Sequence, residues 1–167
     1  MITRADLKDA CWKILELADH YSGVPHREMT IDRLAYGVLH ERFSVARQVS
    51  VGIRTASGRH RRVDFKQSGL NPVFIELACR GQHGNELHPS MNRAELTKLC
   101  KLTRASMRYL LLIDPTAFPP HHVDGLPESY NRVRPYPGRF VRRAVRVMYF
   151  HGRTREHVEF LWRPWRP

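Results

Sequence analysis

The feature that most constrains this chain is the run VFIELAC at residues 73–79, in which six of the seven side chains are apolar. A strand with one solvent-exposed face alternates apolar and polar residues, whereas a continuous apolar run is typical of a central strand covered on both faces. A sheet with such a strand needs helices packed against it, so the run predicts an α/β fold. Glu76 is the one charged residue in the run, and a charge in this setting needs a partner.

Two amphipathic helices are predicted before the first strand. Apolar residues recur at spacings of three and four over residues 6–22, and Gly23 and Pro25 end that pattern. In the second helix Thr30 is the expected N-cap, and the helix is expected to end near Phe43. Each helix is expected to bury one face against the rest of the protein.

The period of the pattern changes to two after the second helix. Apolar residues predict strands at 45–53 and 61–66, followed by the central strand at 73–79. The links between these strands are too short for crossovers, so we expect an antiparallel meander. A helix at 92–104 then carries the chain to a parallel strand at 109–113.

Capping and turn signals complete the outline. Asn92 is the expected cap of the third helix, and Glu95 completes a pattern close to a capping box. The proline-rich connection at 115–138 is predicted to be extended and not helical. A C-terminal β-hairpin is expected within 139–163, and the whole chain, 1–167, is expected to be one domain.

The chain is strongly basic, with a net charge of +12 from 28 cationic and 16 acidic residues. The charge is uneven, because residues 1–40 sum to −1, residues 41–80 to +5 and residues 121–167 to +6. Clustered positive charge predicts a polyanionic partner, either a nucleic acid or an acidic protein. The alternative is base composition, since 23 of the 28 cations are arginine, a bias that a GC-rich genome produces by itself.

Membrane and disulfide-rich classes are not indicated. The sequence has no run of about 18 apolar residues, and its first residues carry no apolar segment typical of a signal peptide. Cys11, Cys79 and Cys100 are odd in number and far apart, which favours buried reduced thiols over disulfides or a zinc site. We therefore expect a cytoplasmic protein with no membrane partner.

The acidic residues of the strand region suggest a site. Residues 41–80 contain only three carboxylates, Glu41, Asp64 and Glu76. Asp64 and Glu76 lie on neighbouring predicted strands, which can bring them together on one face. Burial and mutual repulsion both disfavour such a pair, and a divalent metal relieves both. The alternative is that each acid pairs with a nearby arginine among Arg54, Arg61, Arg62 and Arg80.

The order of elements over residues 28–115 resembles the core of the PD-(D/E)XK nuclease-like superfamily, which includes the restriction endonucleases. That core has a helix, a three-stranded meander with acids on its second and third strands, then a helix and a strand. Asp64 and Glu76 match the two acids, but the motif continues Glu-x-Lys and its lysine position is Ala78 here. The resemblance implies a restriction-endonuclease-like core: a mixed central sheet flanked by helices.

The same resemblance implies roles for individual residues. Asp64 and Glu76 would hold Mg²⁺ or Mn²⁺ and act in catalysis, with Glu41 as an added metal ligand. Some members of the superfamily carry the lysine on the following helix, and Lys98 and Lys101 occupy that helix here. The alternative is that these lysines only make solvated ion pairs on the helix surface.

Six arginines are the predicted nucleic-acid contacts, because arginines near aromatic residues suit backbone contact and stacking. They are Arg61, Arg62, Arg80, Arg139, Arg142 and Arg143. The alternative for the C-terminal cluster is a strand pair that packs its aromatic side chains inward and leaves the arginines in water.

Two functions follow as hypotheses. The first is a metal-dependent nuclease, or a divergent relative of one, that acts on the phosphodiester backbone of nucleic acid, with DNA as the expected substrate. The second is a catalytically inactive nuclease-fold domain that binds nucleic acid or an acidic protein partner, and Ala78 in the lysine position favours it. A purely protein-binding module is a third reading, and a homodimer is compatible with each of them.

Overall fold

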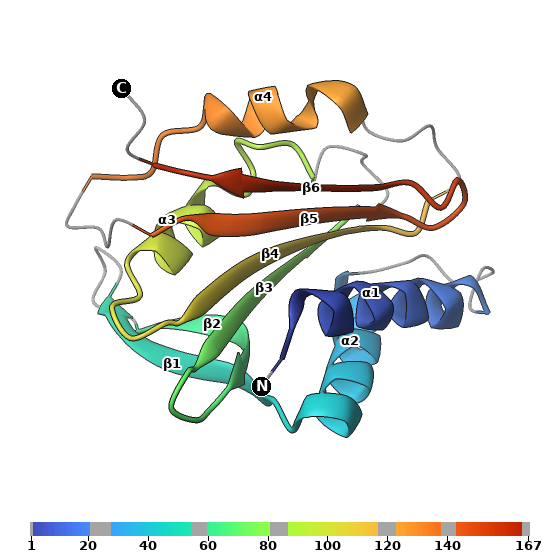
Figure 1. Ribbon diagram of the computed structural model, residues 1–167, viewed down its shortest axis with the longest axis horizontal. Helices are drawn as coiled ribbons and strands as arrows, with labels where there is room; N and C mark the ends of the chain where they lie inside the picture. Colours follow the sequence, from blue (N-terminus) through green and yellow to red (C-terminus); the bar gives the residue numbers. More distant parts are fainter. Residues whose placement is uncertain are drawn as a thin grey trace.

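The strands that the computed structural model describes form one sheet of six strands, arranged in the order in which they occur in the chain (Figure 1). The structure describes residues 2–20, 28–54, 60–80, 87–116, 123–137 and 143–164. The strands are β1 (Ala46–Arg54), β2 (His60–Gln67), β3 (Val73–Cys79), β4 (Met107–Asp114), β5 (Val145–His151) and β6 (His157–Trp162).

The strand pairings confirm the predicted mixed sheet. β1, β2 and β3 form an antiparallel meander, and β3 pairs in parallel with β4. The helix α3 (Arg93–Cys100) makes the crossover between these two strands. β5 pairs in parallel with β4 and antiparallel with β6. The C-terminal hairpin is therefore a continuation of the central sheet and not an appendage to it.

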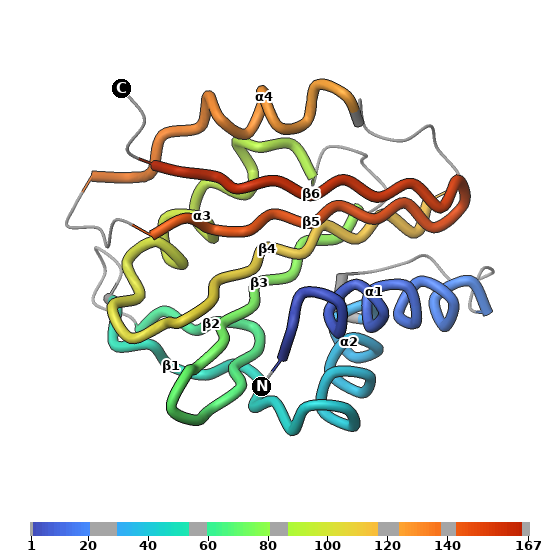
Figure 2. Tube along the Cα trace, viewed as in Figure 1, coloured from blue at the N-terminus to red at the C-terminus, as the bar shows by residue number. Residues whose placement is uncertain are grey.

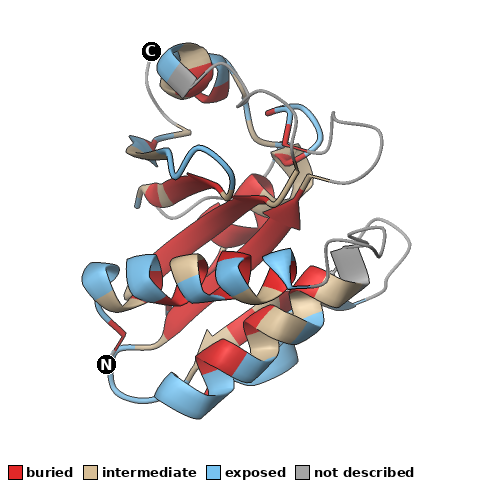
Figure 3. Cartoon of the chain, turned by 90° about the vertical axis from the view of Figure 1, so that its right-hand side faces the viewer, coloured by how far each residue is buried: buried red, intermediate tan, exposed pale blue. Residues whose placement is uncertain are grey.

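Helices cover both faces of the sheet, as the apolar run of β3 requires. α1 (Arg4–Asp19) and α2 (Glu28–Phe43) pack on one face, and α3 and α4 (Leu126–Asn131) pack on the other. Figure 3 shows the strands buried between these layers, with exposed residues on the outer sides of the helices. Every residue of β3 is buried, so Glu76 lies within the core of the fold.

The first two helices begin earlier than predicted. The hydroxyl of Thr3 accepts a hydrogen bond from Asp6 N, and the Asp6 carboxylate accepts one from Thr3 N. This capping box starts α1 at Arg4. α2 begins at Glu28, so Thr30 lies inside the helix and is not its cap, which corrects the prediction. The predicted stop at Gly23 and Pro25 lies outside the described residues.

The prediction that 115–138 is wholly extended is wrong. A turn of 3₁₀ helix at Val123–Gly125 leads into α4, whose first residues include Pro127. Proline is tolerated there because the first amide groups of a helix have no intrahelical partner. Leu126 and Tyr130, four residues apart, are buried on one side of α4, and this tertiary packing stabilises a very short helix.

The predicted capping box at Asn92 is also wrong. Asn92 occupies the N-cap position of α3, but its side chain makes no capping bond. Its Nδ2 donates instead to Tyr130 Oη at 3.1 Å and to His88 O at 3.3 Å. The helix ends at Cys100, before the predicted end at 104, and Thr103 is exposed beyond its end. The amide of Asn92 therefore holds α3 to α4 across the sequence.

The cysteines behave as predicted, since Cys11, Cys79 and Cys100 are all buried and none of the three forms a disulfide. Burial raises the pKa of the Cys100 thiol to about 11, so this group is a poor nucleophile at neutral pH. Within the described ranges, no helix combines the length and the apolar character that a bilayer crossing needs.

Candidate functional site

Asp64 and Glu76 lie where β2 and β3 separate. The backbone pairing of these strands runs only as far as Phe65 and Ile75, and the next residues along each strand are the two acids. Beyond this point Asp64 Oδ2 accepts a hydrogen bond of 2.8 Å from Leu77 N. The carboxylate thus replaces a missing strand carbonyl, and this bond fixes Asp64 beside β3.

The second oxygen of Asp64 is held from the other neighbouring strand. Gln48 Nε2, on β1, donates to Asp64 Oδ1 at 3.1 Å. Gln48 has φ of +53°, a left-handed conformation that is unusual for a residue other than glycine. Asp64 itself is half-buried, so the carboxylate is reached from solvent while both of its oxygens are held in place. Local strain of this kind often marks a functional site.

Lys98 completes the group. It projects from α3, and its Nζ lies 2.7 Å from Glu76 Oε1, with only 10% of the lysine side chain and 1% of the glutamate side chain exposed. The same ammonium donates to Arg62 O at 2.6 Å. The structure therefore brings together Asp64, Glu76 and Lys98, three of the residues that the resemblance implies.

The electrostatics of Glu76 are unbalanced. Burial, followed by the negative charge of Asp64, raises the pKa of Glu76 well above its ordinary value of 4.5. Lys98 acts in the opposite direction and does not cancel the rise. Among the described residues, Glu76 Oε1 has the Lys98 ammonium at 2.7 Å as an ion-pair partner, although this contact is poorly directed for a hydrogen bond. The site therefore holds more negative charge than its own cation neutralises.

These features fit a divalent cation as a further component. Carboxylate oxygens are the ligands that Mg²⁺ prefers, and the poorly satisfied Oε1 of Glu76 is a suitable donor. The described part of the chain contains no cluster of three or more His, Cys, Asp or Glu side chains that could hold a metal. A cation at Asp64 and Glu76 would thus need ligands from water and from a substrate phosphate, as Mg²⁺ commonly has.

Two other residues implied by the resemblance do not reach this group. Glu41 is exposed in the last turn of α2, in the layer on the opposite face of the sheet from α3. Lys101 lies at the end of α3, and its Nζ donates to Pro137 O at 3.4 Å. Of the two candidate lysines, it is Lys98 that the structure brings to the acids.

The six predicted nucleic-acid arginines differ in their surroundings. Arg62 and Arg143 are exposed, and Arg143 Nη1 donates to Ala105 O at 3.1 Å. Arg61 is half-buried and donates to Ala94 O, at the start of α3. The remaining positions in the C-terminal cluster, Arg139 and Arg142, lie outside the described residues.

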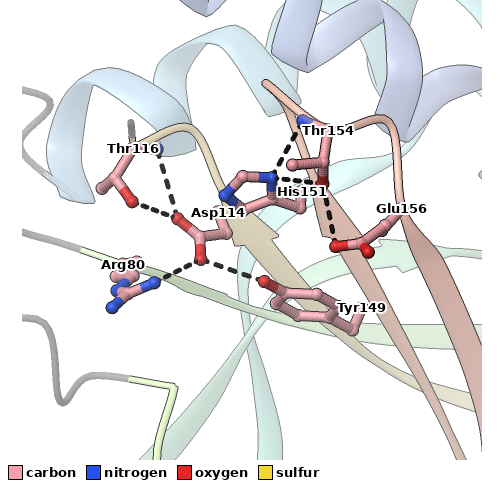
Figure 4. Close-up of polar contacts among 7 residues, drawn as sticks. All are labelled: Arg80, Asp114, Thr116, Tyr149, His151, Thr154 and Glu156. Atoms are coloured by element: carbon pink, nitrogen blue, oxygen red, sulfur yellow. Dashed lines mark hydrogen bonds and ion pairs between the residues drawn. The ribbon is translucent and has the colours of Figure 1, made fainter. Parts of the chain in front are cut away.

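Arg80 belongs to a second polar cluster that the sequence analysis missed (Figure 4). Asp114 is completely buried at the end of β4. It accepts hydrogen bonds from Arg80 Nη1 at 2.9 Å, Tyr149 Oη at 3.0 Å, Thr116 Oγ1 at 2.6 Å and Thr116 N at 3.2 Å. The cluster ties together the carboxyl ends of β3, β4 and β5, so Arg80 has a structural role here, and its contact with nucleic acid stays a prediction.

A buried histidine next to this cluster is explained by a turn. His151 ends β5, and its Nδ1 accepts a hydrogen bond of 3.1 Å from Thr154 N (Figure 4). Thr154 Oγ1 in turn donates to Glu156 Oε2 at 2.9 Å. These bonds shape the connection between β5 and β6, as expected for a polar side chain buried in a tight turn.

Comparisons with protein-family models, with curated proteins and with solved structures give no significant match to this chain. A functional assignment must therefore come from the residues and their arrangement. The arrangement with the most chemical content is the group formed by Asp64, Glu76 and Lys98.

Proposed function

We propose that this protein is a metal-dependent phosphodiesterase of the nuclease type, acting on the phosphodiester backbone of nucleic acid, with DNA as the expected substrate. The observation that carries the proposal is the convergence of Asp64, Glu76 and Lys98 where β2 and β3 separate. The net charge of +12 supports a polyanionic substrate, because charge of this size attracts nucleic acid from a distance.

Each residue of the group has a distinct task in this proposal. Asp64 and Glu76 would hold Mg²⁺ or Mn²⁺, which activates water and neutralises charge on a phosphate. Leu77 N and the Gln48 amide keep the Asp64 carboxylate in a single orientation. Lys98 supplies a fixed positive charge beside Glu76, suited to stabilising negative charge that develops on the phosphate oxygens.

The position of Lys98 also supports the resemblance to the PD-(D/E)XK core. The motif's lysine position on β3 is Ala78, so a nuclease of this type needs its ammonium from elsewhere. α3 follows β3 directly in the order of elements, and one turn of it places Lys98 against Glu76. Lys98 on α3 thus lies next to Glu76, where a lysine at position 78 of β3 would lie in the usual motif.

The test is cleavage of plasmid and of oligonucleotides in Mg²⁺, in Mn²⁺ and in excess EDTA. We expect cutting to need a divalent metal and to fall by at least about 100-fold in Asp64→Asn, Glu76→Gln and Lys98→Gln. Asp9→Asn and Lys8→Gln, both exposed on α1, make the same chemical changes as matched controls and should cut normally. Unchanged cutting in both Asp64→Asn and Glu76→Gln, or full cutting in EDTA, would reject the proposal.

A second candidate is a catalytically inactive domain that binds nucleic acid or an acidic protein. The ion pair between Lys98 and Glu76 favours it, because a buried ammonium already neutralises part of the charge that a metal would balance. This candidate predicts no turnover in any metal, together with binding in EDTA that weakens steeply as salt rises. Metal-dependent cutting lost in Glu76→Gln would exclude it.

A further inference from the structure

A hollow of about 620 Å³ opens on the α3 side of the sheet, next to the group just described. Its walls come from β1, from the turn between β2 and β3 and from the loop between α3 and β4. Figure 2 shows that loop beside β1 and β2, far along the chain from both. The residues that give the hollow its character are Lys66, Ser68, Phe74, Lys101, Leu102 and Arg104.

The lining combines positive charge with an apolar floor. Lys66, Lys101 and Arg104 contribute three cations, and no described lining residue is acidic. Lys66 Nζ lies 5.6 Å from the centre of the Phe74 ring, so charge and aromatic surface meet directly. Such a lining suits a ligand with an anionic group at one end and a flat apolar part at the other.

The hollow lies close to the acid group along three elements of the fold. Lys66 follows Asp64 by two residues on β2, and Phe74 precedes Glu76 by two on β3, a step of about 6.6 Å along each strand. Lys66 and Phe74 are a paired position of the two strands, next to the point where they separate. On the third element, α3, Lys98 near the acids and Lys101 at the hollow are neighbours on one side of the helix.

We propose that this hollow binds one unpaired nucleotide of the nucleic-acid strand, next to the phosphate presented to Asp64 and Glu76. The assignment of the neighbouring phosphate rests on the proposed function, whereas binding in the hollow does not. Lys66, Lys101 and Arg104 hold the phosphate, and the sugar and base lie against Phe74 and Leu102. The volume falls in the range of small-ligand sites and accommodates more than a bare phosphate.

A site for one unpaired nucleotide would distinguish single strands from duplexes. A base in a duplex is paired and stacked, and taking it out costs a few kcal/mol. A base in a single strand or at a frayed end enters without that cost. The protein should therefore bind a single strand more tightly than the blunt duplex of the same sequence, and the hollow should be the cause of the difference.

The experiment measures the Kd of labelled oligonucleotides by fluorescence anisotropy in EDTA, so that no catalysis is required. The double variant Lys101→Gln/Arg104→Gln removes two cations from the hollow and leaves the acid group intact. Lys8→Gln/Arg33→Gln, exposed on α1 and α2, removes the same charge from the other layer. The ligands are one single strand with and without a terminal phosphate, its blunt duplex, and inorganic phosphate as competitor.

For Lys101→Gln/Arg104→Gln we expect at least about 10-fold weaker binding of the single strand. The slope of log Kd against log salt should fall by about 1.4, since each contact to a single strand contributes about 0.7. The preference over the duplex should shrink, and Lys8→Gln/Arg33→Gln should keep it. If a terminal phosphate tightens binding of the single strand, the hollow binds the end of a strand. If it has no effect, the hollow binds an internal nucleotide.

Equal weakening by the two double variants would overturn the inference, because only net charge would then matter. A duplex that binds the wild type as tightly as the single strand would also overturn it. Inorganic phosphate that displaces the strand at equal concentration would show a site for the free anion, with no contribution from the base. If Asp64→Asn and Glu76→Gln leave cutting unchanged but the binding results are as expected, the proposed function is rejected and the nucleotide site in the hollow is retained.

Discussion

Two buried carboxylates, Glu76 and Asp114, stand in opposite electrostatic situations within the same sheet. Both are at most 1% exposed, and both lie next to a single cationic side chain. Asp114 accepts four hydrogen bonds, from Arg80, Tyr149 and Thr116. Glu76 has the ammonium of Lys98 on one side and the carboxylate of Asp64 on the other, and its Oε1 lacks a well-directed hydrogen bond.

The contrast between Asp114 and Glu76 indicates where stability and function are located in this fold. A buried charge with all its hydrogen bonds made holds its surroundings together, as Asp114 does for three parallel strands. A buried charge next to a like charge raises the energy of the folded protein, and sites of that kind are candidates for binding or catalysis. The comparison predicts that equivalent changes at the two positions have opposite effects on the free energy of unfolding.

The largest effect is expected for Asp114→Asn. The amide removes the charge that faces Arg80, which then keeps a buried guanidinium without its ion pair. We expect a loss of about 3 kcal/mol in the free energy of unfolding and a fall in Tm of at least about 6 °C. Urea and thermal unfolding measure both, with Asp9→Asn as an exposed control. A change below about 1 kcal/mol would contradict a structural role for the cluster.

Tyr149→Phe should have a smaller effect of the same sign. It removes one of the four hydrogen bonds to Asp114 and keeps the aromatic packing of β5. Because the acceptor is charged, we expect a loss of about 1.5 kcal/mol by urea unfolding. In the double variant with Asp114→Asn the two losses should sum to less than their separate values, since both act on one network. Full additivity would mean that Tyr149 acts elsewhere.

Glu76→Gln should have the opposite sign. Because the pKa of folded Glu76 is raised, the folded protein holds this proton more tightly than the unfolded chain does. Stability from this group is therefore fully present below the unfolded pKa and is lost as the pH rises through the folded pKa. The variant removes that loss, so its Tm should exceed the wild-type Tm by about 2 °C at pH 8, with a gap that closes toward pH 5.

Thermal unfolding from pH 5 to pH 8 measures this gap. Loss of cleavage together with the gain in Tm would show that Glu76 is retained for activity at the expense of stability. Alternatively, the Tm of Glu76→Gln could fall at pH 8, as expected for Asp114→Asn. That result would mean that the ion pair with Lys98 stabilises the protein more than the burial of Glu76 and the repulsion from Asp64 destabilise it.

The smallest effect on stability is expected for Gln48→Ala. Its hydrogen bond to Asp64 lies at an exposed position, so we expect a change below about 0.5 kcal/mol. Cleavage should still decrease, because Asp64 keeps the bond from Leu77 N to one oxygen and loses the bond that holds its other oxygen. Measuring Tm and cutting rate on one preparation separates the two effects. Unchanged cutting would show that the Gln48 amide has no part in positioning Asp64.

Local patterns in the sequence predicted most of the elements. The apolar run at 73–79 became β3 with the same bounds, and the short links gave the expected meander. The helix at 126–131 was missed because the buried contacts of Leu126 and Tyr130 come from distant parts of the chain. The caps were misassigned for a related reason, since the Asn92 amide bonds to Tyr130 and not to its own helix.

The candidate site was predicted only in part. Asp64 and Glu76 are two of the three acids in a basic stretch, and their positions on neighbouring predicted strands separate them from Glu41. Nothing in the local pattern separates Lys98 from Lys101, because both lie on the same side of one helix. Asp114 also had a weak signal, as an acid at the end of an apolar strand, but its partners Arg80 and Tyr149 come from two other strands.

The hydrophobic period of each segment and the α/β class with a central strand covered on both faces could be predicted from the sequence, because they depend on residues close together in the chain. The strong positive charge follows from composition. The tertiary structure decided which groups meet: that Lys98 faces Glu76, that Arg80 belongs to Asp114, and that Lys66, Lys101 and Arg104 surround one hollow. The physical reason is that burial and electrostatic pairing depend on distances in space, which the packing of the whole sheet and its helices sets.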